Sequence, residues 1–195
     1  MVFTHRSFLF NFRDSAILSS VIGKNRADMS GPVVIMGVAG CGKSSVAAAL
    51  AHALGWQLIE GDDYHPVENV NKMRAGIALS DEDRAGWLLV LADALIQQGP
   101  QAVLTCSALK KSYRDSLRRG VPELRFVHLE LTREQAIARV TQRPDHYFQP
   151  TLVDSQFAAL EKPIHEAGVI TIDATLPIDT IRDQVCAWLK TKECV

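Results

Sequence analysis

Eight residues near the start of the chain have the types and spacing needed to hold phosphate groups. They fit the pattern GxxxxGK[ST] and follow an apolar run, Val33-Val34-Ile35-Met36. Glycines let the backbone bend tightly and aim several N–H groups at one point, where a following helix N-terminus also attracts anions. The pattern predicts a nucleotide site, and the alternative is a glycine-rich turn with an exposed lysine. The predicted binding residues are Gly37, Val38, Ala39, Gly40, Cys41, Gly42, Lys43, Ser44 and Ser45.

Within this loop, two side chains have separate predicted roles. Lys43 would reach the β- and γ-phosphates of the nucleotide. The Ser44 hydroxyl would be a ligand of Mg²⁺, which prefers oxygen. The loop is therefore expected to bind a magnesium–nucleotide complex.

A dense group of carboxylates follows the next apolar run, in the segment Glu60-Gly61-Asp62-Asp63-Tyr64-His65-Pro66. A kinase that acts on a hydroxyl needs a carboxylate to orient that hydroxyl and accept its proton, and further acidic groups near Mg²⁺. We predict the first role for Asp62, and a place beside the metal for Glu60 or Asp63. The alternative is that Asp62 and Asp63 only initiate the helix that follows Pro66.

Two basic segments come later in the chain. Lys110 and Arg114 are four residues apart on one helix face, and we predict that both contact an anionic substrate or phosphate. Arg143 ends a predicted helix and belongs to a segment expected to close as a lid over the nucleotide, bringing a guanidinium to the transferring phosphoryl group. Arg139 is then expected to be an ordinary surface residue. His146 is a candidate substrate contact, although a lone loop histidine is more often simply exposed.

These residues need an alternating fold to bring them together. From Pro32 onward, apolar runs alternate with helical patterns, which predicts an α/β fold with a parallel sheet covered on both faces. Ligands in such folds lie beyond the carboxyl ends of the strands. The predicted strands are 33–37, 56–60, 102–106, 125–131 and 168–173. The predicted helices are 44–54, 66–75, 81–98, 110–119, 133–142, 150–160 and 178–190.

Several nucleotide-dependent classes are disfavoured by what the sequence lacks. The run from Ala102 to Cys106 has no terminal aspartate of the kind that motor ATPases and GTPases use for magnesium. The run Asn71-Lys72-Met73-Arg74 ends in the wrong residue for a guanine-reading NKxD motif. These absences favour a kinase of a small molecule.

Composition describes one soluble domain. The chain has 195 residues, of which 47% are hydrophobic and 22% charged, and its net charge is −1 with a pI of about 6.6. No global field attracts nucleic acid or an anionic membrane, so we expect neither as a partner. The four cysteines have neither CxxC pairing nor metal-ligand spacing, which is typical of the reducing cytoplasm.

Residues 1–30 differ from the rest of the chain. Their apolar residues are interrupted by Asn11, Arg13 and Asp14. This pattern argues against the continuous apolar core of a secretory signal peptide and against a membrane-spanning helix. We expect a flexible or dispensable extension, with Met29 as an alternative start, ahead of a single kinase domain over 31–195. A mitochondrial presequence is the other interpretation.

Taken together, these motifs resemble the gluconokinases from about residue 33 to the C-terminus. The matching residues are the run from Gly37 to Ser44, the run from Gly61 to Pro66, Asn69, Lys72-Met73, Gly76, the run from Leu79 to Arg84, Trp87, the run from Cys106 to Lys111, Tyr113-Arg114-Asp115, Arg143, His146, Phe148, Ser155-Gln156-Phe157, Leu160-Glu161 and Pro163.

This resemblance implies a more specific fold and function. The fold would be a P-loop NTPase three-layer sandwich with a five-stranded parallel sheet and a lid, as in nucleoside-monophosphate and shikimate kinases. The activity would be phosphorylation of D-gluconate at its 6-hydroxyl by Mg-ATP, commonly in a homodimer. The implied substrate-binding residues are Asp62, His65, Lys72, Lys110, Arg114 and His146.

Three positions depart from the family pattern. Glu60 stands where aspartate is usual, Asp145 replaces a lid glycine beside Pro144, and Gly86 replaces a proline. None of the three changes affects Lys43, Ser44, Asp62 or Lys110, so we expect activity to survive. In the proposed chemistry Asp62 takes the hydroxyl proton while Lys43, Mg²⁺ and Arg143 stabilise the phosphoryl group. Two alternatives remain: a shikimate-like or nucleoside-monophosphate kinase, and a regulatory module that binds nucleotide without catalysis.

Overall fold

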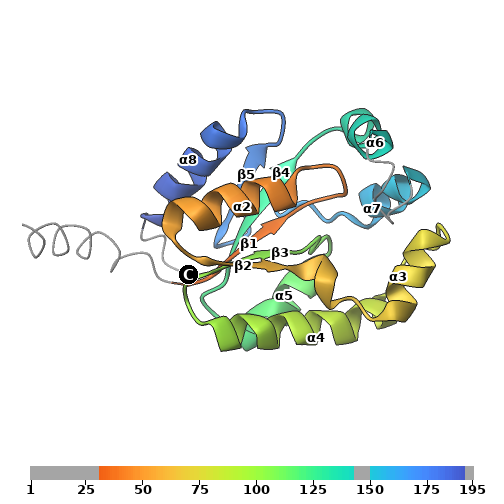
Figure 1. The fold of residues 1–195 in the computed structure, drawn as a ribbon, viewed down its shortest axis with the longest axis horizontal. Coiled ribbons are helices and arrows are strands. Elements are labelled where there is room, and N and C mark those ends of the chain that lie inside the picture. The colour runs from red at the N-terminus through yellow and green to blue at the C-terminus, as the bar shows by residue number, and fades with distance from the viewer. Residues whose placement is uncertain (1–30, 143–149, 192–195) are drawn as a thin grey trace, which may run out of the picture.

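A five-stranded parallel sheet forms the centre of the computed structural model, which describes residues 31–142 and 150–191 (Figure 1). The strand order is β2-β3-β1-β4-β5, and every neighbouring pair is parallel. All five predicted strands are confirmed, each slightly shorter than predicted. They are β1 (Val33–Met36), β2 (Gln57–Glu60), β3 (Ala102–Thr105), β4 (Arg125–Glu130) and β5 (Val169–Asp173).

Helices connect the strands as the sequence predicts. Two of them begin at capping boxes: Ser80 and Asp83 exchange hydrogen bonds at the start of α4, and Thr132 and Gln135 do so at the start of α6. The helices are α2 (Lys43–Leu54), α3 (Val67–Arg74), α4 (Asp81–Gln98), α5 (Lys111–Gly120), α6 (Arg133–Thr141), α7 (Val153–Ala159) and α8 (Ile178–Leu189), with the short 3₁₀ helices η1 (Gly61–Tyr64) and η2 (Pro150–Leu152).

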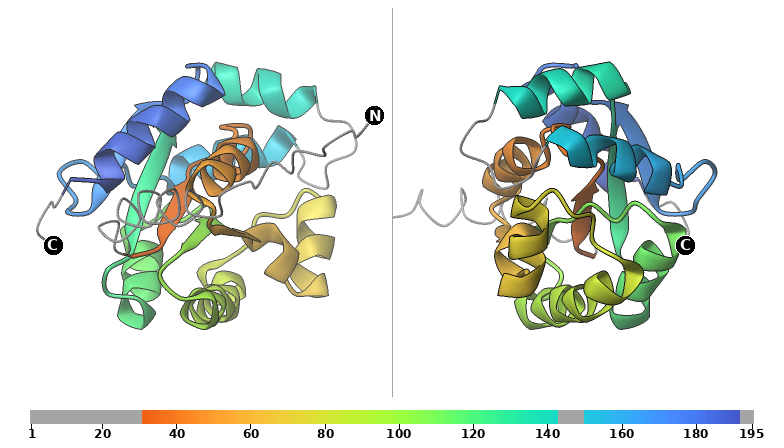
Figure 2. Two further views of the ribbon diagram at one scale, coloured as in Figure 1. Left: turned by 60° about the vertical axis from the view of Figure 1, so that its left-hand side comes forward. Right: turned by 90° about the vertical axis from the view of Figure 1, so that its right-hand side faces the viewer.

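The helices cover both faces of the sheet and make three layers (Figures 1 and 2). Alternate residues of β1 show why, because successive side chains of a strand point to opposite faces. Val33 and Ile35 join the core that contains α2 and α8, whereas Val34 and Met36 join the core that contains α4 and α5. Four consecutive apolar residues are therefore what a strand buried on both faces requires.

The carboxyl ends of the strands meet at the edge of the sheet where Figure 1 shows α3, α6 and α7. At this edge β2 runs very close to β3. A Cβ at Gly61 would lie only 2.1 Å from the Thr105 carbonyl oxygen, so only glycine fits there. This close approach brings the carboxylates that follow β2 next to the end of β3.

Some expectations fall outside the described residues. These include the extension over residues 1–30, the lid residues Arg143 and His146, and the substitutions at Pro144 and Asp145. In the part of the chain that the structure does describe, no helix is long and apolar enough to cross a membrane.

Candidate active site

The phosphate loop joins β1 to α2 and leaves the start of α2 open to an anion. Gly42 occupies the N-cap with a left-handed φ of 94°, no side chain caps the helix, and its first turn contains no acidic residue. N–H groups at a helix N-terminus that lack such a cap are ready donors to phosphate oxygens. The Lys43 ammonium lies over the loop and donates to the carbonyls of Gly37 and Val38, both at 3.2 Å.

Two other segments hold the loop in place. The Gly37 N–H donates to the Ser107 carbonyl at 3.3 Å, which ties the loop to the segment after β3. The Ala39 N–H donates to Gln156 Oε1 at 2.6 Å, which ties it to α7. Within the loop, burial raises the pKa of the Cys41 thiol, so that this side chain is uncharged.

A carboxylate and two hydroxyls meet beside the loop. Glu60 Oε2, at the end of β2, accepts hydrogen bonds from Ser44 Oγ at 3.1 Å and from Thr105 Oγ1 at 2.7 Å. Thr105 Oγ1 in turn accepts from the Gly61 N–H at 3.0 Å, which fixes its orientation. Ser44 and Glu60, two of the residues predicted to lie at the metal, are therefore brought together, and they present the hard oxygen atoms that Mg²⁺ prefers. Among residues 31–142 and 150–191, no group of three or more His, Cys, Asp or Glu side chains could hold a metal ion.

The predicted acceptor residues begin directly after Glu60. Asp62 is exposed on η1, which is anchored because Trp87 Nε1 donates to the Gly61 carbonyl at 2.9 Å. The His65 ring stacks on Trp87 with ring centroids 4.1 Å apart. Burial lowers the pKa of His65 to about 4, so that the ring is neutral at pH 7. His65 therefore offers a neutral imidazole to any ligand.

The charges of Asp62 and Lys43 both shift the pKa of the buried Cys106 thiol. Burial raises the pKa of the Cys106 thiol to about 12, and the charges that further shift this pKa are those of Asp62, Lys43 and Arg84. Lys43 begins α2 after β1 and Asp62 lies on η1 after β2, so the predicted phosphate-binding lysine and the predicted proton acceptor both follow carboxyl ends of neighbouring parts of the sheet.

Both predicted substrate-binding lysines pair with aspartates of the first turn of α4. Lys72 lies 2.7 Å from Asp83, and Lys110 lies 2.7 Å from Asp81, which also accepts a hydrogen bond from the Tyr113 hydroxyl. The lysine contacts are the main reason why the pKa of each aspartate lies below its ordinary value. The pairs are partly exposed and hold α3 and the start of α5 against α4.

The prediction for Arg114 is wrong. Its side chain is 1% exposed, and its guanidinium forms an ion pair with Glu166 at 2.8 Å. The remaining N–H groups donate to the carbonyls of Ala108, Leu109 and Glu161, so that no donor is left for a substrate. Helical spacing alone does not reveal that Arg114 is buried and paired with Glu166, a residue far along the chain.

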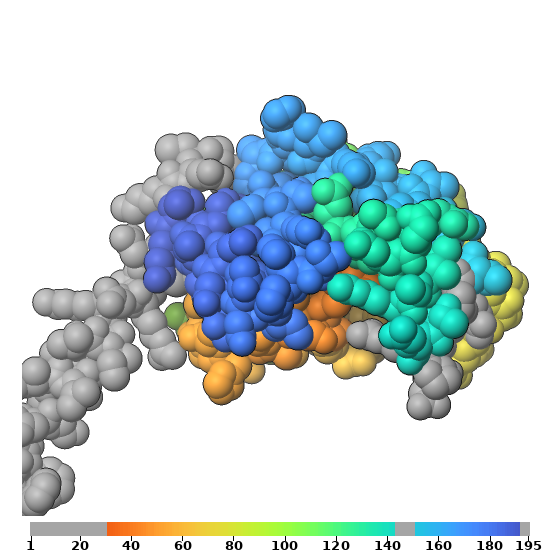
Figure 3. Space-filling model, turned by 90° about the horizontal axis from the view of Figure 1, so that it is seen from above, coloured from red at the N-terminus to blue at the C-terminus, as the bar shows by residue number. Residues whose placement is uncertain are grey.

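The prediction that Arg139 is an ordinary surface residue is also wrong. Its guanidinium donates to the carbonyls of Gly40, at 3.4 Å, and Ala174, at 3.0 Å. It lines a cavity of about 410 Å³ beside the phosphate loop, together with residues that include Ser45, Leu176 and Ile181. Figure 3 shows this face from above, with part of α2 visible between α8 and α6.

Comparisons with known proteins cover most of the chain. A sequence family described as an AAA domain matches residues 33–163. Gluconokinase from Gluconobacter oxydans (strain 621H) is 42% identical over 164 residues, which is 83% of this chain and 92% of that protein. The chain belongs to the gluconokinase family. Thermosensitive gluconokinase from Escherichia coli (strain K12) is 41% identical over 155 residues, which is 77% of this chain and 83% of that protein.

A solved structure agrees with this assignment to the gluconokinase family. The crystal structure of a gluconokinase from Sinorhizobium meliloti 1021 superposes with a TM-score of 0.75 at 41% identity, covering 82% of this chain and 91% of that one. The predicted resemblance and the predicted fold class, a P-loop kinase with a five-stranded parallel sheet, are confirmed.

Two contacts of this gluconokinase-family site were not predicted from single residues. Thr105 ends β3, the strand that lacks the terminal aspartate of motor ATPases and GTPases, and its hydroxyl donates to Glu60. Gln156 belongs to a motif that resembles the family, but the motif does not show that the side chain reaches Ala39, 117 residues away in the sequence. The available signal was that Gln156 is a polar residue on the buried face of the short helix α7, because a buried polar side chain usually has a hydrogen-bond partner.

Proposed function

We propose that this member of the gluconokinase family transfers the γ-phosphoryl group of ATP to the 6-hydroxyl of D-gluconate, giving 6-phospho-D-gluconate and ADP. One observation carries the proposal. Three features lie at one edge of the sheet. They are an open phosphate loop, the Glu60 carboxylate hydrogen-bonded to Ser44, and the exposed carboxylate of Asp62. The names of the relatives supply the identity of the sugar acid.

In the proposed reaction Asp62 orients the 6-hydroxyl and takes its proton. The hydroxyl oxygen forms a bond to the γ-phosphorus while the bond to the bridging oxygen breaks, and that electron pair leaves on ADP. Lys43 exchanges its two loop carbonyls for phosphate oxygens, and Arg143 adds a second positive charge. His65, Lys72, Lys110 and His146 remain proposed acceptor contacts.

Ser44 and Glu60 are the residues proposed to hold Mg²⁺. Their oxygen atoms are 3.1 Å apart beside the phosphate loop, and both are of the kind that Mg²⁺ prefers. When bound, the ion neutralises charge on the β- and γ-phosphates. The one extra methylene of Glu60, relative to the usual aspartate, still lets the carboxylate reach Ser44.

The cavity beside Arg139 is the proposed site of the nucleoside part of ATP. It opens next to Gly40 and Ser45 of the phosphate loop, and apolar side chains of Leu176 and Ile181 supply a surface for a base. A planar guanidinium such as that of Arg139 stacks well on an aromatic ring.

The test is an ADP-release assay with Mg-ATP and a panel of acceptors: D-gluconate, other aldonates, shikimate and AMP. We expect strong turnover on D-gluconate and none after EDTA removes the divalent ion. Preference for another acceptor would keep the kinase and change its substrate. If ATP binds and no acceptor stimulates ADP release, the protein is a nucleotide-binding regulatory module instead.

Two further expectations concern the assembled protein. We propose a homodimer, as the family resemblance implies, and light scattering of the purified protein gives the mass that tests it. We also propose a cytoplasmic location. The three cysteines among the described residues are all free thiols, as is usual in a reducing compartment.

A further inference from the structure

Most cationic side chains around the proposed acceptor site already have a carboxylate partner. Lys72 pairs with Asp83, Lys110 with Asp81, and the buried Arg114 with Glu166. An acceptor carboxylate could reach these cations only by displacing the partner or by sharing the cation with it. Lys72 and Lys110 are therefore better suited to contact hydroxyl groups of the acceptor than its carboxylate, and Arg114 has no donor left for it.

Arg84 differs from these neighbours. It lies on the second turn of α4, directly after Asp83, and its side chain is half-buried. Over residues 31–142 and 150–191, the ion pairs of the structure do not include Arg84. Its guanidinium carbon lies 5.9 Å from the centre of the Tyr113 ring, and this cation–π contact does not neutralise its charge. The Arg84 charge helps to lower the pKa of Asp81, but Asp81 forms its ion pair with Lys110, so the guanidinium can still bind the carboxylate of a ligand.

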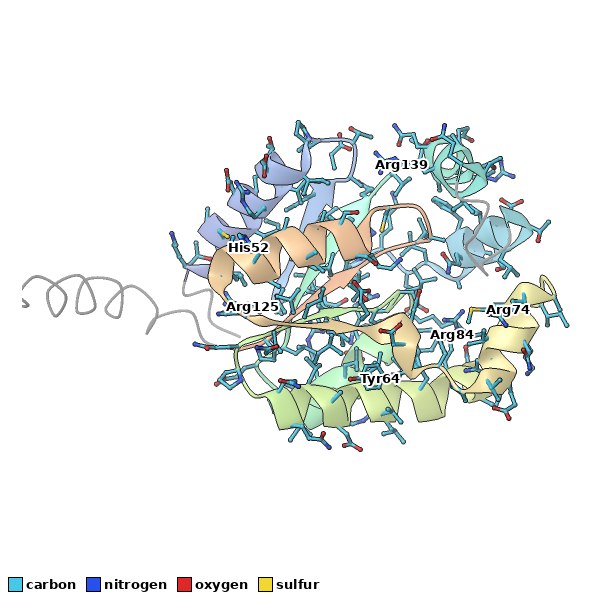
Figure 4. The ribbon with its side chains drawn as sticks, in the orientation of Figure 1. His52, Tyr64, Arg74, Arg84, Arg125 and Arg139 are labelled. Carbon is cyan, nitrogen blue, oxygen red and sulfur yellow. The ribbon has the colours of Figure 1, made fainter. Side chains whose placement is uncertain are left out.

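The position of Arg84 matches that of an acceptor-binding group. In Figure 4 its side chain lies between η1, which carries Asp62, and α3, which carries Lys72. Its charge lowers the pKa of His65 and acts with those of Lys43 and Asp62 on the Cys106 thiol. Arg84 therefore lies within electrostatic reach of the point where phosphoryl transfer is proposed.

The chemistry of the proposed acceptor supplies the missing partner. An aldonate carries a carboxylate at one end of its chain and the reacting hydroxyl at the other. The carboxylate must be kept away from Asp62, because two negative charges repel, and it needs a cation that is free to accept it. Guanidinium suits this role, since its planar fork of N–H donors fits a carboxylate in a bidentate arrangement.

We propose that Arg84 binds the carboxylate of the acceptor and thereby makes the enzyme select a sugar acid over the corresponding neutral polyol. This inference rests on the proposed kinase function. It adds a specificity-determining residue to a site in which Asp62 accepts the proton of the acceptor hydroxyl and the phosphate loop binds ATP. Arg84 acts at the end of the acceptor that does not react.

The test compares two acceptors in wild type and Arg84→Gln. D-Gluconate and D-glucitol share the carbon chain and the hydroxyl that would be phosphorylated, but glucitol carries an alcohol in place of the carboxylate. We expect R84Q to raise KM for gluconate by about 10- to 100-fold, the range for a charged hydrogen bond, with KM for ATP unchanged. The weak binding of glucitol, measured as turnover or as inhibition of the gluconate reaction, should not change.

Two further variants make the test specific. Arg119→Gln removes an exposed arginine from the last turn of α5 and should leave both acceptors unaffected. Arg84→Lys keeps the charge but loses the fork of donors, so it should raise KM for gluconate less than R84Q does, again without an effect on glucitol. This variant also serves if R84Q does not fold.

The outcomes separate the two proposals. An active wild type whose R84Q and R84K variants keep the wild-type KM for gluconate would overturn the role of Arg84 while leaving the kinase intact. An equal loss of gluconate and glucitol binding would also overturn it, because that is the pattern of a purely structural arginine. A wild type that phosphorylates neither acceptor overturns the proposed function, and the inference with it.

Discussion

Glu60 and Asp62 are two residues apart, yet they have different surroundings. The Glu60 carboxylate accepts hydrogen bonds from Ser44 and Thr105, which fix its position. Asp62 is exposed, and in the described part of the chain no side chain donates to it. Two neighbouring carboxylates in unlike environments can take unlike roles. The hydrogen-bonded carboxylate of Glu60 suits a metal ion, and the exposed carboxylate of Asp62 suits a substrate hydroxyl.

This division predicts the effect of Asp62→Asn. The amide keeps the size of the side chain but cannot take a proton from the hydroxyl. We expect kcat to fall by about 10²- to 10⁴-fold, the usual contribution of a general base, with ATP affinity retained. Steady-state kinetics with gluconate, together with ATP titration by fluorescence, measure both quantities.

The matched control is Asp93→Asn, which makes the same change at an exposed position of α4 away from the site. It should have wild-type kinetics. An Asp62→Asn enzyme with near-wild-type kcat would remove Asp62 from the role of base, whatever its effect on KM.

At the scale of helices and strands, the sequence predicts the architecture well. Apolar runs such as Val33–Met36 are long enough to be buried on both faces, and the capping residues Ser80 and Thr132 mark helix starts, so local patterns determine these elements. The 3₁₀ helix η1 was not predicted, because its form depends on the approach of β2 to β3 at Gly61.

The contacts between elements were harder to predict. Arg114 has the helical spacing of a ligand-binding residue, but its partner Glu166 belongs to the connection between α7 and β5. Arg139 shows no motif, and only the folded chain brings it to the carbonyls of Gly40 and Ala174. Sequence spacing describes one element at a time, whereas these roles arise where two elements meet.

The contact between α7 and the phosphate loop is the most direct of these. Gln156 is 8% exposed, and its side-chain oxygen accepts the Ala39 N–H at 2.6 Å. Since α7 follows the predicted lid segment in the chain, this hydrogen bond links the nucleotide-binding loop to the element beyond the lid. We interpret Gln156 as a positioning residue that fixes one peptide of the loop.

Replacement of Gln156 by Met tests this link. Methionine has a similar length but no comparable acceptor, so the Ala39 N–H loses its partner and the loop loses a restraint. We expect KM for ATP to rise by about 10-fold, the equivalent of one hydrogen bond, while KM for gluconate stays within a factor of two or so of wild type. Gln97→Met, at an exposed position of α4, is the control. Equal KM values for ATP in Q156M and wild type would contradict the positioning role.

At the scale of the whole molecule, the sheet buries a titratable group that the proposed chemistry does not use. His128 on β4 is 2% exposed, and its Nδ1 lies 3.3 Å from the Thr171 hydroxyl on β5. Burial lowers its pKa from 6.5 to about 4, against the opposing effect of the Glu130 charge. The folded protein therefore keeps this ring neutral under conditions in which the unfolded chain protonates it.

This pKa shift predicts an acid-sensitive stability. Between pH 6.5 and 4 the unfolded state binds a proton at His128 and the folded state does not, so the free energy of unfolding falls as the pH falls through this window, by up to about 1.4 kcal/mol per pH unit. Above pH 6.5 His128 contributes no slope. Carboxylates with a lowered pKa, such as Glu130, reduce stability only as the pH falls below about 4.5, which leaves the upper part of the window to histidine.

Urea unfolding followed by tryptophan fluorescence at pH 7.5, 6.5, 5.5 and 4.75 measures this slope. His128→Asn retains a polar atom near the position of Nδ1 but cannot be protonated, so its stability should depend less on pH than that of wild type, even if it is lower at pH 7.5. His52→Asn, at an exposed position of α2, should keep the wild-type slope. If H128N and wild type lose stability in parallel from pH 6.5 to 4.75, the buried ring on β4 does not control the acid sensitivity of this fold.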